Sequence, residues 1–387
     1  MTMTQPAKLR NPVHLLLIIV AIIACTKLPL LTSAPNRLLS GQGILLYQLG
    51  ARYWLLALPA LPLLLAPWLP PTRASCIILV IAAAGLSGGL LALAGHEARL
   101  RTGDIDSLVR VSFGGAFWLL LLTAWLQLAE ALRGLALSLA ARVTVILAAL
   151  TPIVALLVSG RLDRLSLLQE YQNHQDAFDL ALLRHVQLVA FSVMPAVLIG
   201  ALLGTLSFRS RLAHKLLFPV LNAIQTIPSI ALFGLLIAPL ALLGSLFPQS
   251  GIGGVGLAPA LLALTLYSLL PMTRGTLAGL EQVPPAVREA ASGIGMSPWQ
   301  IFFRVELPLA LPIFLASVRV TAVQAIGLAV VAALIGAGGF GAIMFQGMAS
   351  SALDLVLLGV IPVILLAIGV DTLFKVAISI FRGQNHD

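Results

Sequence analysis

Long runs of apolar residues recur along the whole 387-residue chain and constrain its fold more than any other feature. A helix needs about 20 apolar residues to cross a bilayer, where backbone polar groups must be satisfied within the segment. Hydrophobic residues make up 59% of the chain and charged residues 10%, and no run alternates like the strands of a membrane barrel. The sequence therefore predicts an all-α polytopic membrane protein.

The apolar runs predict ten transmembrane spans. The seventh run is too long for one straight span and contains three prolines, so a kink is expected in it. The first span is expected to be retained, because Pro35 follows the only small-residue candidate for a signal cleavage site. The ten predicted spans are 13–31, 53–69, 75–95, 113–132, 143–159, 186–207, 217–245, 257–273, 313–335 and 355–376.

The placement of lysine and arginine predicts that both chain termini lie in the cytoplasm. With the amino terminus inside, the inner segments hold thirteen basic residues and the outer loops eight, in line with basic cytoplasmic loops. The net charge of +9 then needs no nucleic-acid partner, since no basic patch is interleaved with aromatic residues. Cys25 and Cys76 lie in apolar runs without metal or redox spacing and are expected to be packing residues.

The chain divides into two sets of five spans around its most polar stretch. We expect an amino-terminal extension (1–159), an external amphipathic loop (160–185), a second set of spans (186–376) and a cytoplasmic tail (377–387). Five plus five spans is also the plan of inverted-repeat secondary transporters, although the two halves share no motif. An ion-gradient-driven transporter of a small solute is therefore the alternative function.

The segment 281–312 carries the polar residues that the spans lack and predicts two short helices. Pro285 suits the first position of one helix, Gly293 and Gly295 are expected to end it, and Gly295 is expected to set the bend between the two helices. Five apolar residues of this segment would share one face, which an ordinary solvated loop does not explain: Val287, Ile294, Trp299, Phe302 and Phe303. We expect a docking platform that lies along the membrane surface.

The second helix of the platform is expected over 298–305. Ser297 and Pro298 suit the N-cap and the first turn of that helix. Pro308 and Pro312 are expected to prevent a straight run into the next span.

The platform resembles the cytoplasmic signature of binding-protein-dependent ABC importer permeases. That signature is Glu-Ala-Ala, three residues, Gly, nine residues, an aliphatic residue, one residue and Leu-Pro. Seven positions fit it: Glu289, Ala290, Ala291, Gly295, Val305, Leu307 and Pro308. The resemblance implies that 186–376 is a type I ABC importer transmembrane domain whose coupling helices, at 285–305, dock on an ABC ATPase subunit. It also implies that this chain holds no cofactor and that the ATPase binds ATP and Mg.

Three further segments resemble importer permeases for glycine betaine and other quaternary-amine osmoprotectants: 224–241, 266–284 and 335–347. The likeness covers about 183–376, and the amino-terminal extension resembles the long, low-affinity-type subgroup. It implies an inner-membrane permease for glycine betaine or a related compatible solute. A periplasmic solute-binding protein and a second permease subunit, either a copy or a paralogue, are the implied partners.

A break in the seventh run is predicted at 226–229. Pro228 removes one backbone donor, and Thr226 and Ser229 can bond the freed carbonyls. Irregular backbone at membrane depth is tolerated against protein or beside a water-filled path, so a translocation gate and a plain structural kink both remain open. The predicted path residues also include neighbouring and intramembrane groups: Gln225, Ile227 and Gln324.

Two further features leave alternatives open. Gly200 and Gly204 form a small-residue face that suits close packing, either within the chain or against a second copy. Arg319 lies about two turns into the ninth span and could face the bundle or extend to the membrane surface. The sequence contains no Walker motif, so ATP hydrolysis would come from another chain.

Overall fold

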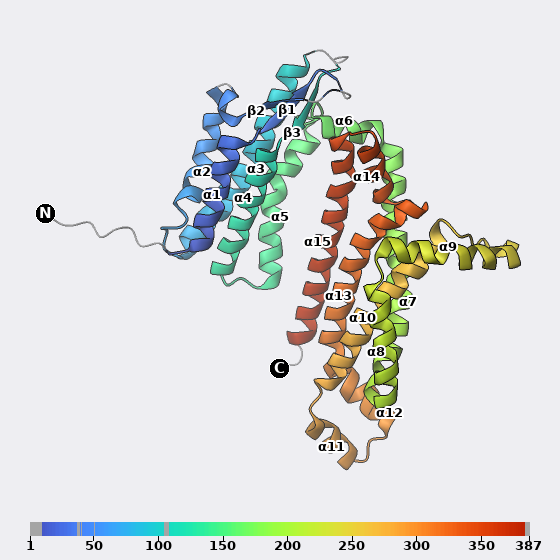
Figure 1. Cartoon of the computed structure of the whole chain (residues 1–387). Helices are drawn as coiled ribbons and strands as arrows, with labels where there is room; N and C mark the ends of the chain where they lie inside the picture. The colour runs from blue at the N-terminus through green and yellow to red at the C-terminus, as the bar shows by residue number, and fades with distance from the viewer. Residues whose placement is uncertain (1–9, 37–38, 40, 50, 104–107, 384–387) are drawn as a thin grey trace. The chain divides into compact units, whose positions relative to one another are not determined.

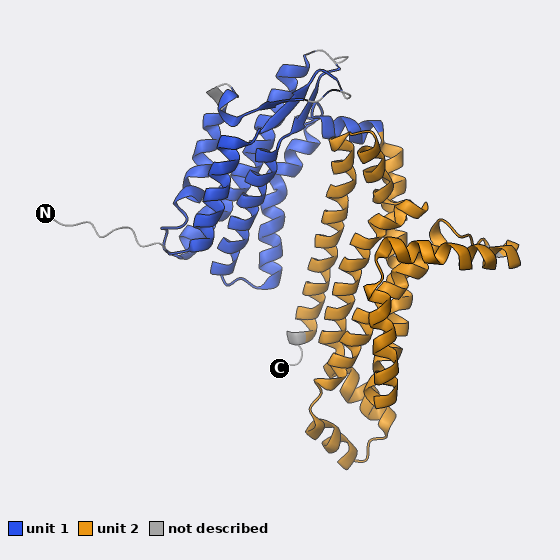
Figure 2. Cartoon of the chain, viewed as in Figure 1, with its two compact units in different colours: residues 1–173 blue, residues 174–387 orange. Residues whose placement is uncertain are grey.

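The computed structural model describes residues 10–36, 39, 41–49, 51–103 and 108–383. The chain forms two compact units, unit 1 (1–173) and unit 2 (174–387), which Figure 2 shows in different colours. Helices dominate both units (Figure 1), and the predicted fold class, an all-α polytopic membrane protein, is confirmed. The end of the predicted tail, 384–387, lies outside the described residues.

Within the described residues, eight helices are long and apolar enough to cross a membrane, so the predicted count of ten is not confirmed. The first two predicted spans correspond to shorter apolar helices, α1 (Pro12–Lys27) and α2 (Ala57–Leu65). The seventh predicted span is divided into α8 (Arg211–Thr226) and α9 (Ser229–Leu246), and of these α9 qualifies as a span.

Unit 1 is a helical bundle in which α3 packs against α2, α4 and α5. Its core is mostly leucine and alanine, and it includes the stacked rings of Phe113 and Phe117, whose centroids are 4.0 Å apart. Cys76 is buried in this core and Cys25 is half-buried, as expected for packing residues. The remaining helices of unit 1 are η1 (Leu46–Gln48), η2 (Ala51–Leu56), α3 (Arg73–Thr102), α4 (Gly115–Gly134), α5 (Leu139–Val158) and α6 (Ser166–Asn173).

A small antiparallel sheet, which the sequence did not predict, lies at one end of unit 1 (Figure 1). Its strand order is β2-β1-β3, and the strands are β1 (Leu31–Ala34), β2 (Gln42–Ile44) and β3 (Arg110–Phe113). Strands of three or four residues are too short to show a two-residue alternation in the sequence. Arg110 on β3 donates a hydrogen bond to Gln169 on α6, which joins the sheet to that helix.

Unit 2 is built around three long helices, with α10 packed against both α7 and α13. The helix α15 packs against α13 and α14, whereas α9 projects sideways from this bundle (Figure 1). The buried residues of α9 are Leu232 and Phe233, which lie near its start. The other elements of unit 2 include α7 (Gln175–Arg209), η3 (Pro248–Ser250), α10 (Leu257–Glu281), α13 (Leu307–Val331), η5 (Ala332–Ile335), α14 (Phe340–Ala349) and α15 (Leu353–Gly383).

The polar stretch 160–185, expected as an amphipathic loop, is largely helical. It forms α6 and the first turns of α7. His185 on α7 is fully buried: its Nε2 lies 3.1 Å from the Ile326 carbonyl oxygen, and its ring centroid lies 5.5 Å from that of Phe340. This histidine is therefore a packed residue of unit 2.

Two glycines allow α7 and α10 to approach at backbone distance. A Cβ added at Gly200 would lie 2.5 Å from the Cβ of Met272, and one at Gly204 would lie 2.6 Å from the Cβ of Thr276. Real Cβ atoms essentially never come closer than 3.0 Å to another heavy atom. The small-residue face of α7 is therefore used for packing within the chain, the first of the two alternatives.

Candidate docking platform and helix break

The first helix of the predicted platform, α11 (Pro285–Gly293), lies at one end of unit 2 (Figure 1). Pro285 occupies the first turn, as predicted. The helix ends in a Schellman motif, in which Met296 N donates to Ala291 O at 3.2 Å and Gly295 N to Ser292 O at 3.0 Å. Gly295 has a φ of +85°, a left-handed conformation that favours glycine. The predicted turn at Gly295 is confirmed.

The second helix, α12 (Pro298–Ile301), begins with a capping box. Ser297 N donates to Gln300 Oε1 at 2.8 Å, and Gln300 N donates back to Ser297 Oγ at 3.4 Å. Pro298 follows at the first helical position. The predicted N-cap at Ser297 is therefore confirmed.

The second helix does not end before the next span. It continues through a π-helical turn, η4 (Phe302–Glu306), into α13, where Leu307 N bonds to Phe302 O five residues earlier. The prediction that this helix ends at 305 is wrong, because it runs past Pro308 and Pro312 without interruption. Pro308 falls in the first turn of α13, and the wide π turn before it takes up the hydrogen-bond register that a proline would otherwise break.

The platform exposes apolar side chains outside the predicted spans. Ile294 is 80% exposed, Trp299 73% and Phe303 56%, and the Trp299 and Phe303 rings stack with centroids 5.8 Å apart. An exposed apolar patch of this kind is typical of a protein interface. Of the seven signature positions, Ala291 is buried, Val305 is half-buried and five are exposed: Glu289, Ala290, Gly295, Leu307 and Pro308.

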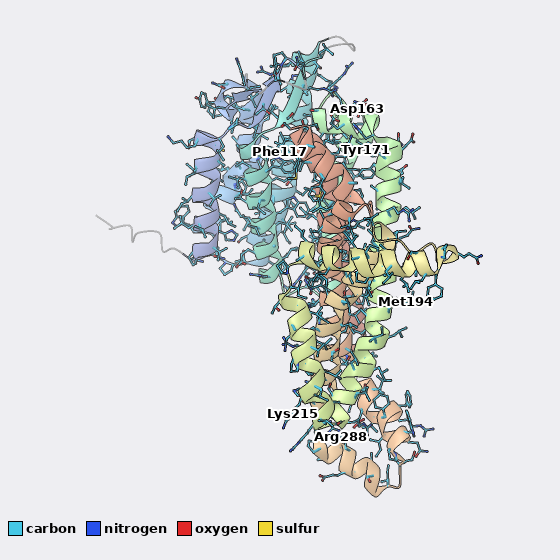
Figure 3. The ribbon with its side chains drawn as sticks, turned by 45° about the vertical axis from the view of Figure 1, so that its right-hand side comes forward. Phe117, Asp163, Tyr171, Met194, Lys215 and Arg288 are labelled. Carbon is cyan, nitrogen blue, oxygen red and sulfur yellow. The ribbon has the colours of Figure 1, made fainter. Side chains whose placement is uncertain are left out.

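Beneath the platform lies an ion network that the sequence analysis did not predict. It consists of Arg209 at the end of α7, Arg288 on α11 and Glu306 in the π turn, and we call it the charge clamp. Figure 3 labels Arg288 at the same end of unit 2 as Lys215 on α8. The signal available in the sequence was the presence of three charges in or beside a segment that is otherwise apolar, but nothing in the sequence pairs them.

The predicted break between α8 and α9 is present. Ile227 and Pro228 are extended, with ψ of 127° and 137°, and Thr226 Oγ1 donates to the Ala223 carbonyl at 2.7 Å. The hydroxyl of Tyr267 on α10 donates to the Ile227 carbonyl. Of the two predicted hydroxyl donors, Thr226 therefore bonds a freed carbonyl, and Tyr267 supplies a donor that sequence reasoning missed.

The other predicted path residues lie at different places in unit 2. Gln225 on α8 donates from Nε2 to the Tyr267 carbonyl, so it belongs to the same hydrogen-bonded group as the break. Ser229 is half-buried at the start of α9. Gln324 on α13 is also half-buried, and no hydrogen bond among the described residues joins it to the break.

Arg319 is paired within unit 2. Its Nη1 lies 3.6 Å from Oδ1 of Asp371 on α15, whose Oδ2 lies 2.6 Å from Lys375 Nζ. The side chain of Arg319 is 27% exposed. The arginine on α13 therefore forms an ion pair with an acid on α15, a pairing that the sequence alone does not indicate.

Two protein families have models that match the chain. The model described as "Binding-protein-dependent transport system inner membrane component" matches residues 196–379. The model described as "ABC transporter permease YehY, N-terminal domain" matches residues 9–168. The two matches cover different parts of the chain, so each half has relatives of its own.

Individual relatives match the second half. The osmoprotectant import permease protein OsmW of Salmonella typhimurium is 43% identical over 194 residues, which cover 49% of this chain and 85% of that protein. The choline transport system permease protein OpuBB of Bacillus subtilis is 34% identical over 50% of this chain and 83% of its own length. An inward-facing MetNI methionine ABC transporter structure aligns with 54% of this chain at 19% identity and a TM-score of 0.49. The family assignment rests on the sequence matches.

Proposed function

The chain belongs to the family of inner-membrane components of binding-protein-dependent transport systems, and from this premise we propose that it is the permease of an ATP-driven importer for glycine betaine or a related compatible solute. It is a multi-pass inner-membrane transport subunit rather than an enzyme. Permeases of this family work with an ATPase and a substrate-binding protein, which favours an ATP-driven importer over the ion-gradient-driven alternative.

The proposed substrate class is supported by the relatives. Their names specify osmoprotectant, choline, and glycine betaine/carnitine/choline transport, and choline, carnitine and glycine betaine all carry a quaternary ammonium group. Proteins usually hold such a group between aromatic faces. Phe233 and Phe340 are fully buried in packing, so their faces are not open to a solute. This supports a path of low affinity, with recognition carried out by a periplasmic solute-binding protein.

The observation that carries the proposal is the exposed apolar helix pair at the end of unit 2. We propose that Ile294, Trp299 and Phe303 dock on an ABC ATPase subunit together with the exposed signature residues Glu289, Ala290 and Gly295. Ala291, which is buried, would lie away from the docking surface. Movement of the docked platform would reach α13 through Val305, Leu307 and Pro308, because α12 is continuous with that span.

The remaining assignments are also proposals. Residues 186–376 would form the permease core, with 1–159 and 160–185 as additions to it and both termini in the cytoplasm. A second permease subunit, a copy or a paralogue, would complete the path. The break would serve as a gate. The hydroxyl of Tyr267 on α10 holds the unwound backbone by donating to the Ile227 carbonyl, while Gln225 at the end of α8 donates to the Tyr267 carbonyl. Thr226 donates to the Ala223 carbonyl within α8. Gln324 would line the path from α13.

Purification in gentle detergent, with ATPase activity measured with and without betaine-loaded binding protein, tests the proposal. An ATPase subunit that copurifies and is stimulated by the loaded binding protein is the expected result. Uptake into vesicles, compared between glycine betaine, choline and carnitine, then identifies the solute. If the chain purifies without an ATPase and takes up solute only along an ion gradient, the proposal is wrong and the secondary-transporter alternative holds.

A further inference from the structure

The charge clamp buries a carboxylate where the platform meets the spans. Glu306 is 3% exposed, and each of its oxygens is used. Oε2 lies 3.1 Å from Nη2 of Arg209, and Oε1 lies 3.1 Å from Nε of Arg288. The two arginines come from different elements, α7 and α11, while Glu306 lies in the π turn before α13. One side chain therefore ties together three separate parts of unit 2.

Arg288 extends these connections to a fourth element. Its Nη2 donates to the carbonyl of Leu280 at the end of α10, at 2.6 Å. Its guanidinium also lies over the ring of Phe208 on α7, 4.8 Å from the centroid. Arg209 lies 5.8 Å from the centroid of Phe302 in the π turn. Cation–π contacts and charge-assisted hydrogen bonds thus hold both guanidinium groups in defined positions.

The platform helix has little else to hold it. Ala291 is the one buried residue of α11, so apolar packing contributes little to its position. The clamp supplies the ionic connection of α11 to the end of α7, and Arg288 supplies the link to the end of α10. Buried ion pairs are weak stabilisers, because desolvation offsets their attraction, and in some proteins their role is to fix relative geometry. The clamp therefore suits the positioning of α11 better than the stabilisation of the fold.

We infer that Arg209, Arg288 and Glu306 are positioning residues that make α11 move as one body with the ends of α7 and α13. A displacement of the platform by the ATPase is then transmitted to the spans. Without the clamp, the loop around α11 would bend and the spans would not move. The inference rests on the proposed function, since it presupposes that an ATPase docks on the platform. It adds the residues through which that docking acts on the spans.

The test uses the full complex with its ATPase, reconstituted in lipid vesicles with binding protein. Glu306→Gln removes the carboxylate charge but leaves two arginines with a lost partner. The triple variant Arg209→Gln, Arg288→Gln, Glu306→Gln leaves no lone buried charge and guards against simple misfolding. Arg133→Gln is the matched control: it removes an arginine from an exposed ion pair with Glu130 in unit 1, whose atoms are 3.1 Å apart.

Three quantities are measured: the ATPase retained on purification, the stimulation of ATP hydrolysis by betaine-loaded binding protein, and the solute imported per ATP. We expect Glu306→Gln and the triple variant to retain the ATPase but to lose at least tenfold in solute per ATP, with Arg133→Gln unchanged. Normal solute per ATP in the triple variant overturns the inference and leaves the proposed function intact.

Two other outcomes also overturn the inference. If both variants lose the ATPase, the clamp shapes the docking surface and does not transmit its movement. If the unmodified complex retains no ATPase, the proposed function fails and the inference fails with it. The unmodified complex therefore distinguishes the failure of the proposed function from the failure of the clamp.

Discussion

Replacement of Gly295 by alanine separates backbone conformation from side-chain contact in the platform turn. A Cβ at this position would meet nothing within 4 Å, so the variant creates no clash. Its cost arises from the φ of +85°, which in an L-residue brings Cβ too close to the carbonyl oxygen and costs about 1–2 kcal/mol. Opening of the turn should become roughly 5- to 30-fold more frequent, since 1.4 kcal/mol is a factor of ten.

Gly293→Ala is the matched control for this variant. Gly293 also has nothing within 4 Å of an added Cβ, but it is the last residue of α11 and its φ is not positive, so alanine is favoured over glycine there by at most about 0.5–1 kcal/mol. Both variants lose the same freedom in the unfolded chain, so the difference between them isolates the cost of the positive φ. The two variants should therefore change the stability of the turn in opposite directions.

Amide hydrogen exchange measures the opening directly. Gly295 N and Met296 N donate to Ser292 O and Ala291 O within the turn, so their exchange reports how often it opens. In the purified complex, Gly295→Ala should accelerate their exchange, and Gly293→Ala should leave it unchanged or slow it. Equal exchange rates in the two variants would refute the conformational argument for Gly295.

Three further predictions concern single side chains. Glu289→Lys reverses a charge on the exposed platform and should abolish solute uptake while the thermal unfolding temperature stays unchanged; normal uptake would contradict its docking role. Gly204→Ala places a Cβ 2.6 Å from the Cβ of Thr276 on α10 and should destabilise the protein by about 1–3 kcal/mol through overpacking, whereas Gly369→Ala, with nothing within 4 Å, should not. Thermal unfolding in detergent compares the two variants, and equal shifts of the unfolding temperature would contradict the close packing. Tyr267→Phe leaves the Ile227 carbonyl without its hydroxyl donor, at a cost of about 1–3 kcal/mol. The uptake rate and the unfolding temperature of the Tyr267→Phe variant should both fall, and unchanged values of both would contradict the role proposed for Tyr267.

The sequence predicted those features that depend on a few neighbouring residues. The Ser297 cap, the Gly295 turn and the break around Pro228 are each specified by residues whose backbone preferences act locally. The platform could be located from the sequence alone, because a short amphipathic segment stands out between apolar runs. These local signals also carried the resemblance to the importer permeases.

Features that need distant partners could not be predicted. Glu306 and Arg209 are 97 positions apart, and their pairing depends on how α7 and α13 pack. The same holds for Arg319 and Asp371, which lie on different helices. The error at Pro308 had another cause. Proline was treated as a helix end, but the π turn before it provides a register in which the helix continues.

Close packing and hydrogen bonding together indicate where unit 2 can move in the proposed transport cycle. A Cβ at Gly204 of α7 or at Gly275 of α10 would lie 2.6 Å or 2.0 Å from the Cβ atom facing it, on α10 and α13 respectively. Helices that pack this closely at their glycines cannot slide past one another without first separating. The break is instead held to α10 through the hydrogen bonds of Tyr267, each worth a net ~1 kcal/mol. In the proposed cycle, a push on the platform would therefore move α7, α10 and α13 as one body, and the change in backbone conformation would fall at Ile227 and Pro228.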